Sequence, residues 1–171
     1  MSIERIKDMK RVLRRGKEAW ERFRENHQER TESDVRIQYV DLSGMEFEDY
    51  NFNGIIFIGV NFCGCRFIRT GLRNCYFFRC DFTSSQFTGV DLYGSTFRQT
   101  TLEGVKMVDM NLCYMKMYDV NFRSSIVYDV AMCEVKMENV DLYDTKMDYK
   151  LLLRTNNELS GITLGTQADE E

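Results

Sequence analysis

A five-residue repeat runs without interruption from Val40 to Tyr149, and it limits what this chain can fold into. In all 22 units the third residue is Leu, Phe, Met or Val, and the first is Val, Met, Tyr, Ile, Cys, Thr or Ser. A helical period of 3.6 residues or a strand period of two loses phase with such a repeat. Repeats of fixed length predict a stacked array in which each unit buries its apolar residues against its neighbours.

The repeat resembles the pentapeptide-repeat family, whose units follow the pattern Ala-(Asp/Asn)-Leu-X-X. The matching units are VDLSG at 40–44, VNFCG at 60–64, CDFTS at 80–84, VDLYG at 90–94, VNFRS at 120–124 and VDLYD at 140–144. Ala is almost absent from the first position, and Met replaces Leu or Phe in many later units. The resemblance implies an all-β fold, a right-handed quadrilateral β-helix in which four units make one square coil.

In that fold the first and third residues of each unit point inward, and side chains twenty residues apart stack. The resemblance therefore implies an interior that is aromatic toward the N-terminus and rich in sulfur toward the C-terminus. We expect these methionines to be core residues, because Met adapts to irregular interior space. The two expected columns are Phe57, Phe77, Phe97, Met117 and Met137, and Phe47, Phe67, Phe87, Met107, Val127 and Met147.

Residues 1–39 differ in kind, since apolar residues recur there at helical spacing between charged ones. This pattern predicts an amphipathic helix from about 3 to about 29 with Ser2 as its N-cap, and then a lead-in strand at 35–39. We expect the helix to cover the first coil, with Trp20 and Phe23 as the covering residues. Two alternatives are a partner-binding or dimerising helix and a basic helix for nucleic acid or membrane, which the interleaved acids disfavour.

The phase of the repeat breaks after Tyr149, so residues 150–171 form a separate C-terminal segment. The apolar run Leu151, Leu152 and Leu153 predicts a short helical or irregular plug over the last coil. The repeat then resumes with Leu159 in a register shifted by two, and an acidic tail follows at 167–171. The alternative is that this apolar C-terminal segment joins two chains end to end in a homodimer.

Few side chains suit catalysis or metal binding. His27 is the only histidine, so a histidine-based triad or metal site cannot be built. Cys63 and Cys65 point outward and inward respectively, so they cannot share an ion. The sequence therefore predicts a protein that is not an enzyme and holds no cofactor or metal.

The remaining cysteines fall into two groups. Cys65, Cys75 and Cys80 take inward first positions, where a small side chain is needed. Cys113 and Cys133 are outward, twenty residues apart and therefore stacked, so they could form a disulfide if oxidised or bind a soft metal weakly. We expect two exposed free thiols, since neither a signal peptide nor an apolar run of membrane-spanning length is present and the cytoplasm is reducing.

Two surface features suggest contacts. Outward apolar residues and an arginine-rich stretch predict an interaction face, made of Ile56, Ile58, Tyr76, Phe78, Tyr118, Arg66, Arg69, Arg73 and Arg79. The N-terminal helix or a second copy of the chain would be the simplest cover for this face. Acids at outward fifth positions predict an acidic face, made of Asp109, Asp119, Asp129, Glu134 and Asp144.

The sequence thus favours an interaction or scaffold module with an unidentified protein partner. The alternative follows from the resemblance, because quinolone-resistance members mimic DNA and bind a type II topoisomerase such as DNA gyrase. A sequence pI of about 5.2 argues against direct binding of nucleic acid, and the absence of an apolar span argues against the membrane.

Overall fold

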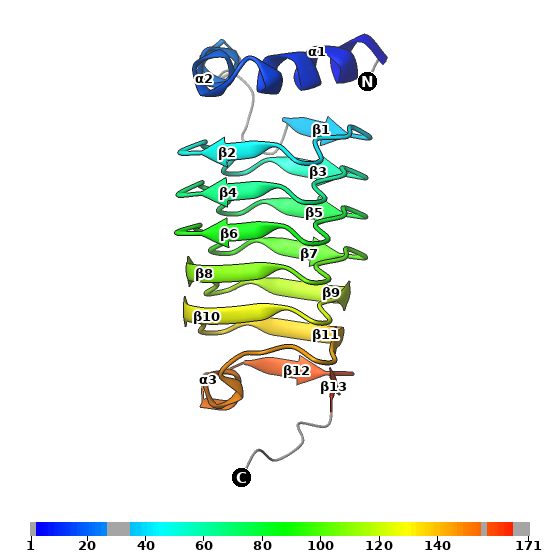
Figure 1. Cartoon of the computed structure of the whole chain (residues 1–171), viewed down its shortest axis with the longest axis vertical. Coiled ribbons are helices and arrows are strands. Elements are labelled where there is room, and N and C mark those ends of the chain that lie inside the picture. The colour runs from blue at the N-terminus through cyan, green and yellow to red at the C-terminus, as the bar shows by residue number, and fades with distance from the viewer. Residues whose placement is uncertain (1–2, 27–34, 155–156, 166–171) are drawn as a thin grey trace.

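The computed structural model describes residues 3–26, 35–154 and 157–165. These residues form a parallel β-solenoid of about six turns, with two short helices at its N-terminal end and one near its C-terminal end (Figure 1). The predicted fold class, a pentapeptide-repeat β-helix with little helix, is confirmed. The predictions for Ser2, His27 and the tail at 167–171 lie outside the described residues.

Two parallel sheets form opposite sides of the solenoid (Figure 1). Sheet A contains β1 (Arg36–Gln38), β3 (Ile56–Ile58), β5 (Tyr76–Phe78), β7 (Thr96–Arg98), β9 (Lys116–Asn121), β11 (Lys136–Leu142), β12 (Glu158–Ser160) and β13 (Thr163–Leu164). Sheet B contains β2 (Glu46–Glu48), β4 (Arg66–Ile68), β6 (Gln86–Thr88), β8 (Lys106–Asn111) and β10 (Ile126–Ala131). From β1 to β11, paired residues are twenty apart, as in Ile56 with Tyr76, so four five-residue units make one coil.

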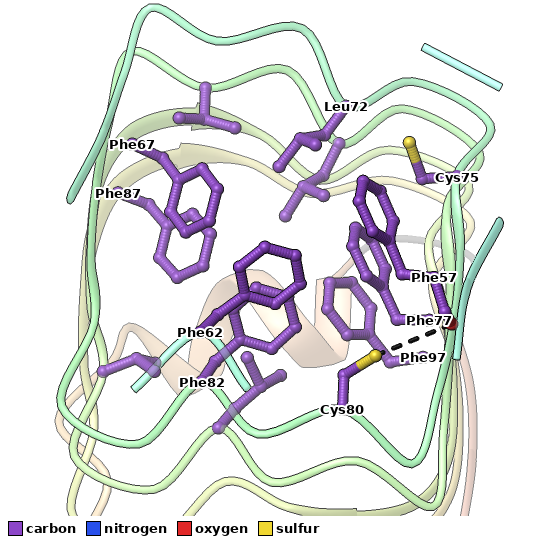
Figure 2. Close-up of a cluster of buried hydrophobic side chains, with 14 of the residues drawn as sticks. Phe57, Phe62, Phe67, Leu72, Cys75, Phe77, Cys80, Phe82, Phe87 and Phe97 are labelled. Carbon is purple, nitrogen blue, oxygen red and sulfur yellow. Dashed lines mark hydrogen bonds between the residues drawn. The ribbon is translucent and has the colours of Figure 1, made fainter. Parts of the chain in front are cut away.

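The interior consists of the first and third residues of the units, which are buried almost throughout. The two predicted columns are confirmed by strand pairing from Phe57 to Met137 and from Phe47 to Val127. Figure 2 shows the rings stacked coil upon coil, with centroids 5.1 Å apart for Phe57 and Phe77 and 4.6 Å apart for Phe77 and Phe97. Identical side chains in successive coils thus pack face to face along the solenoid axis.

The second position of many units holds Asp or Asn because its side chain closes the following turn. The Oδ1 atom of Asp41 accepts a hydrogen bond from the Ser43 backbone N–H at 3.1 Å, and the same bond recurs in later coils. Gly71 has no such oxygen. Asn53 in the preceding coil replaces it and accepts from the Arg73 backbone N–H at 2.8 Å, in space that a side chain at Gly71 would occupy.

The N-terminal segment contains two helices, α1 (Ile3–Arg14) and α2 (Lys17–Glu25), so the prediction of one continuous helix is wrong. The chain turns at Gly16, whose φ of 94° lies in the region that favours glycine. This turn directs Trp20 of α2 onto the end of the solenoid. The Trp20 side chain is fully buried, its ring lies 5.0 Å from that of Phe52, and its Nε1 donates to the Asn51 carbonyl at 2.8 Å.

The C-terminal end begins with α3 (Tyr149–Arg154), the short helix expected over the last coil. Its Leu152 is buried, but Leu153 is 76% exposed, so the prediction that Leu153 helps to cover the coil is wrong. Consecutive leucines on a single helical turn point in different directions. The register shift is confirmed, because Leu159 pairs with Met137, twenty-two residues earlier.

Candidate interaction surface

Four half-buried apolar side chains on neighbouring strands of sheet A form one patch. Ile56 on β3 pairs with Tyr76 on β5, and Ile58 pairs with Phe78. The Tyr76 and Phe78 rings lie 6.5 Å apart and nearly parallel. We call these four residues the apolar patch. The described helices α1 and α2 lie across the end of the solenoid and leave this side of sheet A uncovered (Figure 1).

Arginines line one edge of the apolar patch. The guanidinium of Arg79 lies 4.9 Å from the centre of the Phe78 ring, a cation–π contact. Arg98 follows Phe78 in the next coil, and its guanidinium lies 5.9 Å from the ring of Tyr118. Tyr118 is therefore on the same side as the patch, but Arg98 separates it from Phe78.

The prediction that four arginines border this patch is wrong for three of them. Arg66 lies on β4 in sheet B, on the opposite side of the solenoid, and donates to Glu46 at 2.7 Å. Arg69 follows β4 and bonds Glu48 and Asp49. Arg73 lies on a third side, above Tyr93. Residues ten apart, such as Ile56 and Arg66, are half a coil apart and face opposite ways.

The predicted acidic face is also wrong, because its five residues do not share a side. Asp109 and Asp129 lie in the equivalent strands β8 and β10 of sheet B, whereas Asp119 lies in β9 of sheet A. Glu134 and Asp144 follow at the two remaining corners, since each step of five residues advances the chain by one side. The acids are thus spread around the solenoid.

Backbone geometry gives these acids a structural reason to be there. Every fifth position from Tyr39 to Asp144 has a positive φ, for example 54° at Asp109 and 69° at Gly94. Asp, Asn and Gly are the residues that enter this left-handed region most readily. Acids at these positions therefore follow from the turn and do not by themselves indicate an anionic binding face.

The inward cysteines act as hydrogen-bond donors in the core. The Cys65 thiol lies 3.1 Å from the Leu42 carbonyl oxygen, and Cys80 makes the equivalent contact with Phe57 (Figure 2). Inward serines and threonines do the same, as Ser85 does to Phe62 at 2.7 Å. Burial raises the pKa of Cys65 to about 11, and it raises the pKa of Cys75 and Cys80 to about 12. The three thiols are therefore protonated at neutral pH.

These pKa values predict that the inward thiols react slowly with thiol reagents. Thiolates are the reactive species, so in a native titration with Ellman's reagent we expect only Cys63, which is half-buried at the surface, to react readily. Cys65, Cys75 and Cys80 should react only after a denaturant is added. Cys63→Ser is the control, because it should remove the native reaction alone. Equal native rates for all four thiols would contradict the assignment.

Cys113 and Cys133 form a disulfide between adjacent coils, so the prediction of two free thiols there is wrong. Their Cα atoms are 4.6 Å apart, because residues twenty apart are neighbours in this fold. The sequence showed that the two side chains stack, but stacking alone did not decide between thiol and disulfide.

This disulfide is expected to stabilise the fold by closing a loop with a sequence separation of 20. Chain-entropy arguments give about 3 kcal/mol for a loop of this length. Cys133→Ser should lower the free energy of unfolding by that order in urea titrations, and a reductant should bring the wild type to the same midpoint. Cys63→Ser, which removes no disulfide, should leave the midpoint unchanged. If a reductant left the urea midpoint of the wild type unchanged, the disulfide would be excluded.

Within residues 3–26, 35–154 and 157–165, no group of three or more His, Cys, Asp or Glu residues is arranged to hold a metal ion. In the same ranges, none of the helices is long and apolar enough to cross a membrane.

Comparison with known proteins agrees with this geometry. Residues 33–107 match the family model described as pentapeptide repeat region. No curated protein sequence matches significantly. Among solved structures, the pentapeptide repeat protein Rfr23 from the cyanobacterium Cyanothece 51142 has a TM-score of 0.56 at 14% identity, covering 82% of this chain and 95% of that one.

Two further solved structures are more distant. A trypsin-treated form of QnrB1, a plasmid-mediated fluoroquinolone resistance protein, has a TM-score of 0.41 at 16% identity and covers 77% of this chain and 83% of that one. HetL, a pentapeptide repeat protein involved in heterocyst differentiation regulation in the cyanobacterium Nostoc sp. strain PCC 7120, has a TM-score of 0.35 at 11% identity, covering 76% and 72%. On the repeat, the family match over residues 33–107 and the fold shared with Rfr23, the chain is similar to the pentapeptide-repeat proteins.

Proposed function

We propose that this chain is a non-catalytic interaction module that binds a partner protein through the apolar patch. The observation that carries the proposal is the cluster of Ile56, Ile58, Tyr76 and Phe78 on the adjacent strands β3 and β5 of sheet A. Aromatic residues and arginine contribute most of the binding energy in protein interfaces. Phe78 with Arg79 at its edge has that composition.

Sheet B differs from this side at the first outward position of its early strands. The outward residues at the start of its first four strands are Glu46, Arg66, Gln86 and Lys106. Beyond the patch, sheet A also becomes polar, with Thr96, Lys116 and Lys136 outward. An apolar cluster bordered by polar residues is the usual form of a protein contact site.

The solenoid suits this role because its surface is ordered before binding. Each coil is held by parallel strand pairing and by the stacked core, so few backbone or side-chain conformations are lost on association. Pentapeptide-repeat proteins are in general non-catalytic structural or interaction modules. The proposal applies that general property to this chain.

The alternative, DNA mimicry directed at a type II topoisomerase, has less support. Duplex DNA carries one charge per ~1.7 Å of axis, so a stretch as long as six coils, about 29 Å, carries roughly 17 charges. The formal net charge of this chain is −4, and its acids lie at all four corners. We therefore keep the apolar patch as the proposed contact.

The proposal is tested by placing a charge in the patch. Phe78→Glu should abolish capture of the partner in affinity purification, because a carboxylate would be buried in an apolar contact. Thr88→Glu is the matched control, since Thr88 has the equivalent outward position on β6 in sheet B. Size-exclusion chromatography of both variants shows whether the partner is a second copy. Loss of the partner with both variants, or with neither, would contradict the proposal.

A further inference from the structure

A basic groove lies between α1 and the first coil, away from the apolar patch. It has a volume of about 450 Å³ and is lined by Lys10, Arg11, Arg14, Arg15, Tyr39, Val40 and Asp41. Helix α1 contributes Lys10, Arg11 and Arg14, and Arg15 follows the helix. The chain leading out of β1 contributes the other wall. Figure 1 shows α1 lying across the end of the solenoid above β1.

The groove is positive although the chain is negative overall. Its lining carries four cationic side chains and one carboxylate, whereas the formal net charge of the chain is −4. Lys10 Nζ lies 3.7 Å from Asp41 Oδ2, and the other oxygen of Asp41 accepts from the Ser43 backbone N–H. Asp41 is therefore already engaged, and Arg14 and Arg15 remain exposed.

The helix end does not account for this many cations. The carboxyl end of a helix carries about half a negative charge, which a single cation balances. The positive charge of the exposed Arg14 and Arg15 favours an anionic ligand. Arginine guanidinium groups match the oxygens of phosphate in a two-point geometry, and a groove of this volume fits a small molecule.

Tyr39 forms part of the wall of the groove. Its side chain is 70% exposed, although the ring rests against Gly59 of the next coil, where a Cβ atom would come within 2.9 Å of it. Gly59 thus holds the Tyr39 ring at the rim of the groove. The signal in the sequence was the group of four cations from Lys10 to Arg15, a stretch that contains no acid.

We propose that this groove is a binding site for a small phosphate-bearing anion, with Arg14 and Arg15 as the principal ligands of the phosphate. The phosphate could belong to a free compound or to a lipid headgroup, because both present the same oxygens to the arginines. Direct binding of duplex nucleic acid is disfavoured, since the adjoining sides of the first coil carry Asp41, Glu46 and Glu48.

The test is calorimetric titration of the full chain with inorganic pyrophosphate at low ionic strength. We expect saturable binding that the double variant Arg14→Ala/Arg15→Ala weakens by about tenfold or more, as loss of charge-assisted hydrogen bonds implies. The double variant Lys116→Ala/Lys146→Ala is the control. It removes the same charge from exposed sites in the sheets and should bind like the wild type.

Two further arms identify the source of the phosphate. Vesicles of phosphatidylcholine with and without phosphatidylinositol 4-phosphate should retain the chain, in an arginine-dependent way, if the ligand is a headgroup. If the chain binds pyrophosphate but is not retained by either kind of vesicle, the natural ligand is a free compound. Failure of pyrophosphate and vesicles to bind would overturn the proposal, as would equal weakening by both double variants. Binding of duplex DNA alone would overturn it in favour of nucleic acid. None of these outcomes depends on the apolar patch.

Discussion

Phe77→Ala is expected to lower the free energy of unfolding by about 3–5 kcal/mol, a large part of the total stability of a typical domain. The ring is fully buried and stacks between Phe57, with centroids 5.1 Å apart, and Phe97, at 4.6 Å. It also meets Phe82 edge-on at 5.3 Å. The stacked neighbours are held by their own coils, so they cannot collapse fully into the space left by the ring.

The residue next in sequence provides the control. Phe78 belongs to the same strand, but its side chain points outward and is half-buried. Phe78→Ala should therefore cost about 1 kcal/mol or less. Urea titrations followed by far-UV circular dichroism measure both variants, and an unchanged slope would show that the transition itself is preserved. Similar losses for the two variants would contradict the inward and outward assignment.

Trp20→Ala is expected to destabilise the N-terminal end by a similar amount, about 3–5 kcal/mol. The indole is fully buried, lies 5.7 Å from the Phe23 ring and 5.0 Å from the Phe52 ring, and donates to the Asn51 carbonyl. Its removal would expose the first coil, whose strand edges then become available for pairing with other chains. We expect a lower thermal midpoint, faster proteolysis ahead of residue 35, and aggregation.

Trp20→Phe separates the two contributions of the indole. It keeps an aromatic ring against Phe52 but removes the N–H, so the loss should fall to about 1–2 kcal/mol. Arg24 supports the same contact, because its Nη1 donates to the Asn53 carbonyl at 3.1 Å. If Trp20→Ala left both the unfolding midpoint and the helical signal unchanged, α2 would not act as a cap and the partner-binding alternative for this segment would gain support.

The core of this protein was predictable from sequence because it depends on a single periodicity. Once four units are taken as one coil, each inward residue is placed by counting in twenties, and the columns through Phe57 and Phe47 follow. The two-residue shift at Leu159 was predictable for the same reason. Strand pairing in a closed coil leaves little freedom to depart from this count.

The surface was less predictable, because charged residues that are close together in the sequence lie on different sides of the solenoid. Counting in tens would have placed Arg66 opposite Ile56, and counting in fives would have spread the acids from Asp109 to Asp144 over the four corners. Other features depend on information that periodicity does not contain. The N-terminal helix is interrupted at Gly16 because this residue adopts a positive φ. The groove beside Tyr39 forms only where α1 meets the first coil.

The pairing of residues twenty apart has a consequence for how such a chain can change in length. A tandem duplication of twenty residues would add one coil and leave every downstream side chain on its original side. An insertion of five would preserve the buried pattern but rotate everything beyond it by a quarter turn. Selection for a stable interior accepts both changes, whereas selection for a binding surface accepts only the first. Tolerance to insertions of five and of twenty would therefore reveal which stretches of this rod are under selection for contact.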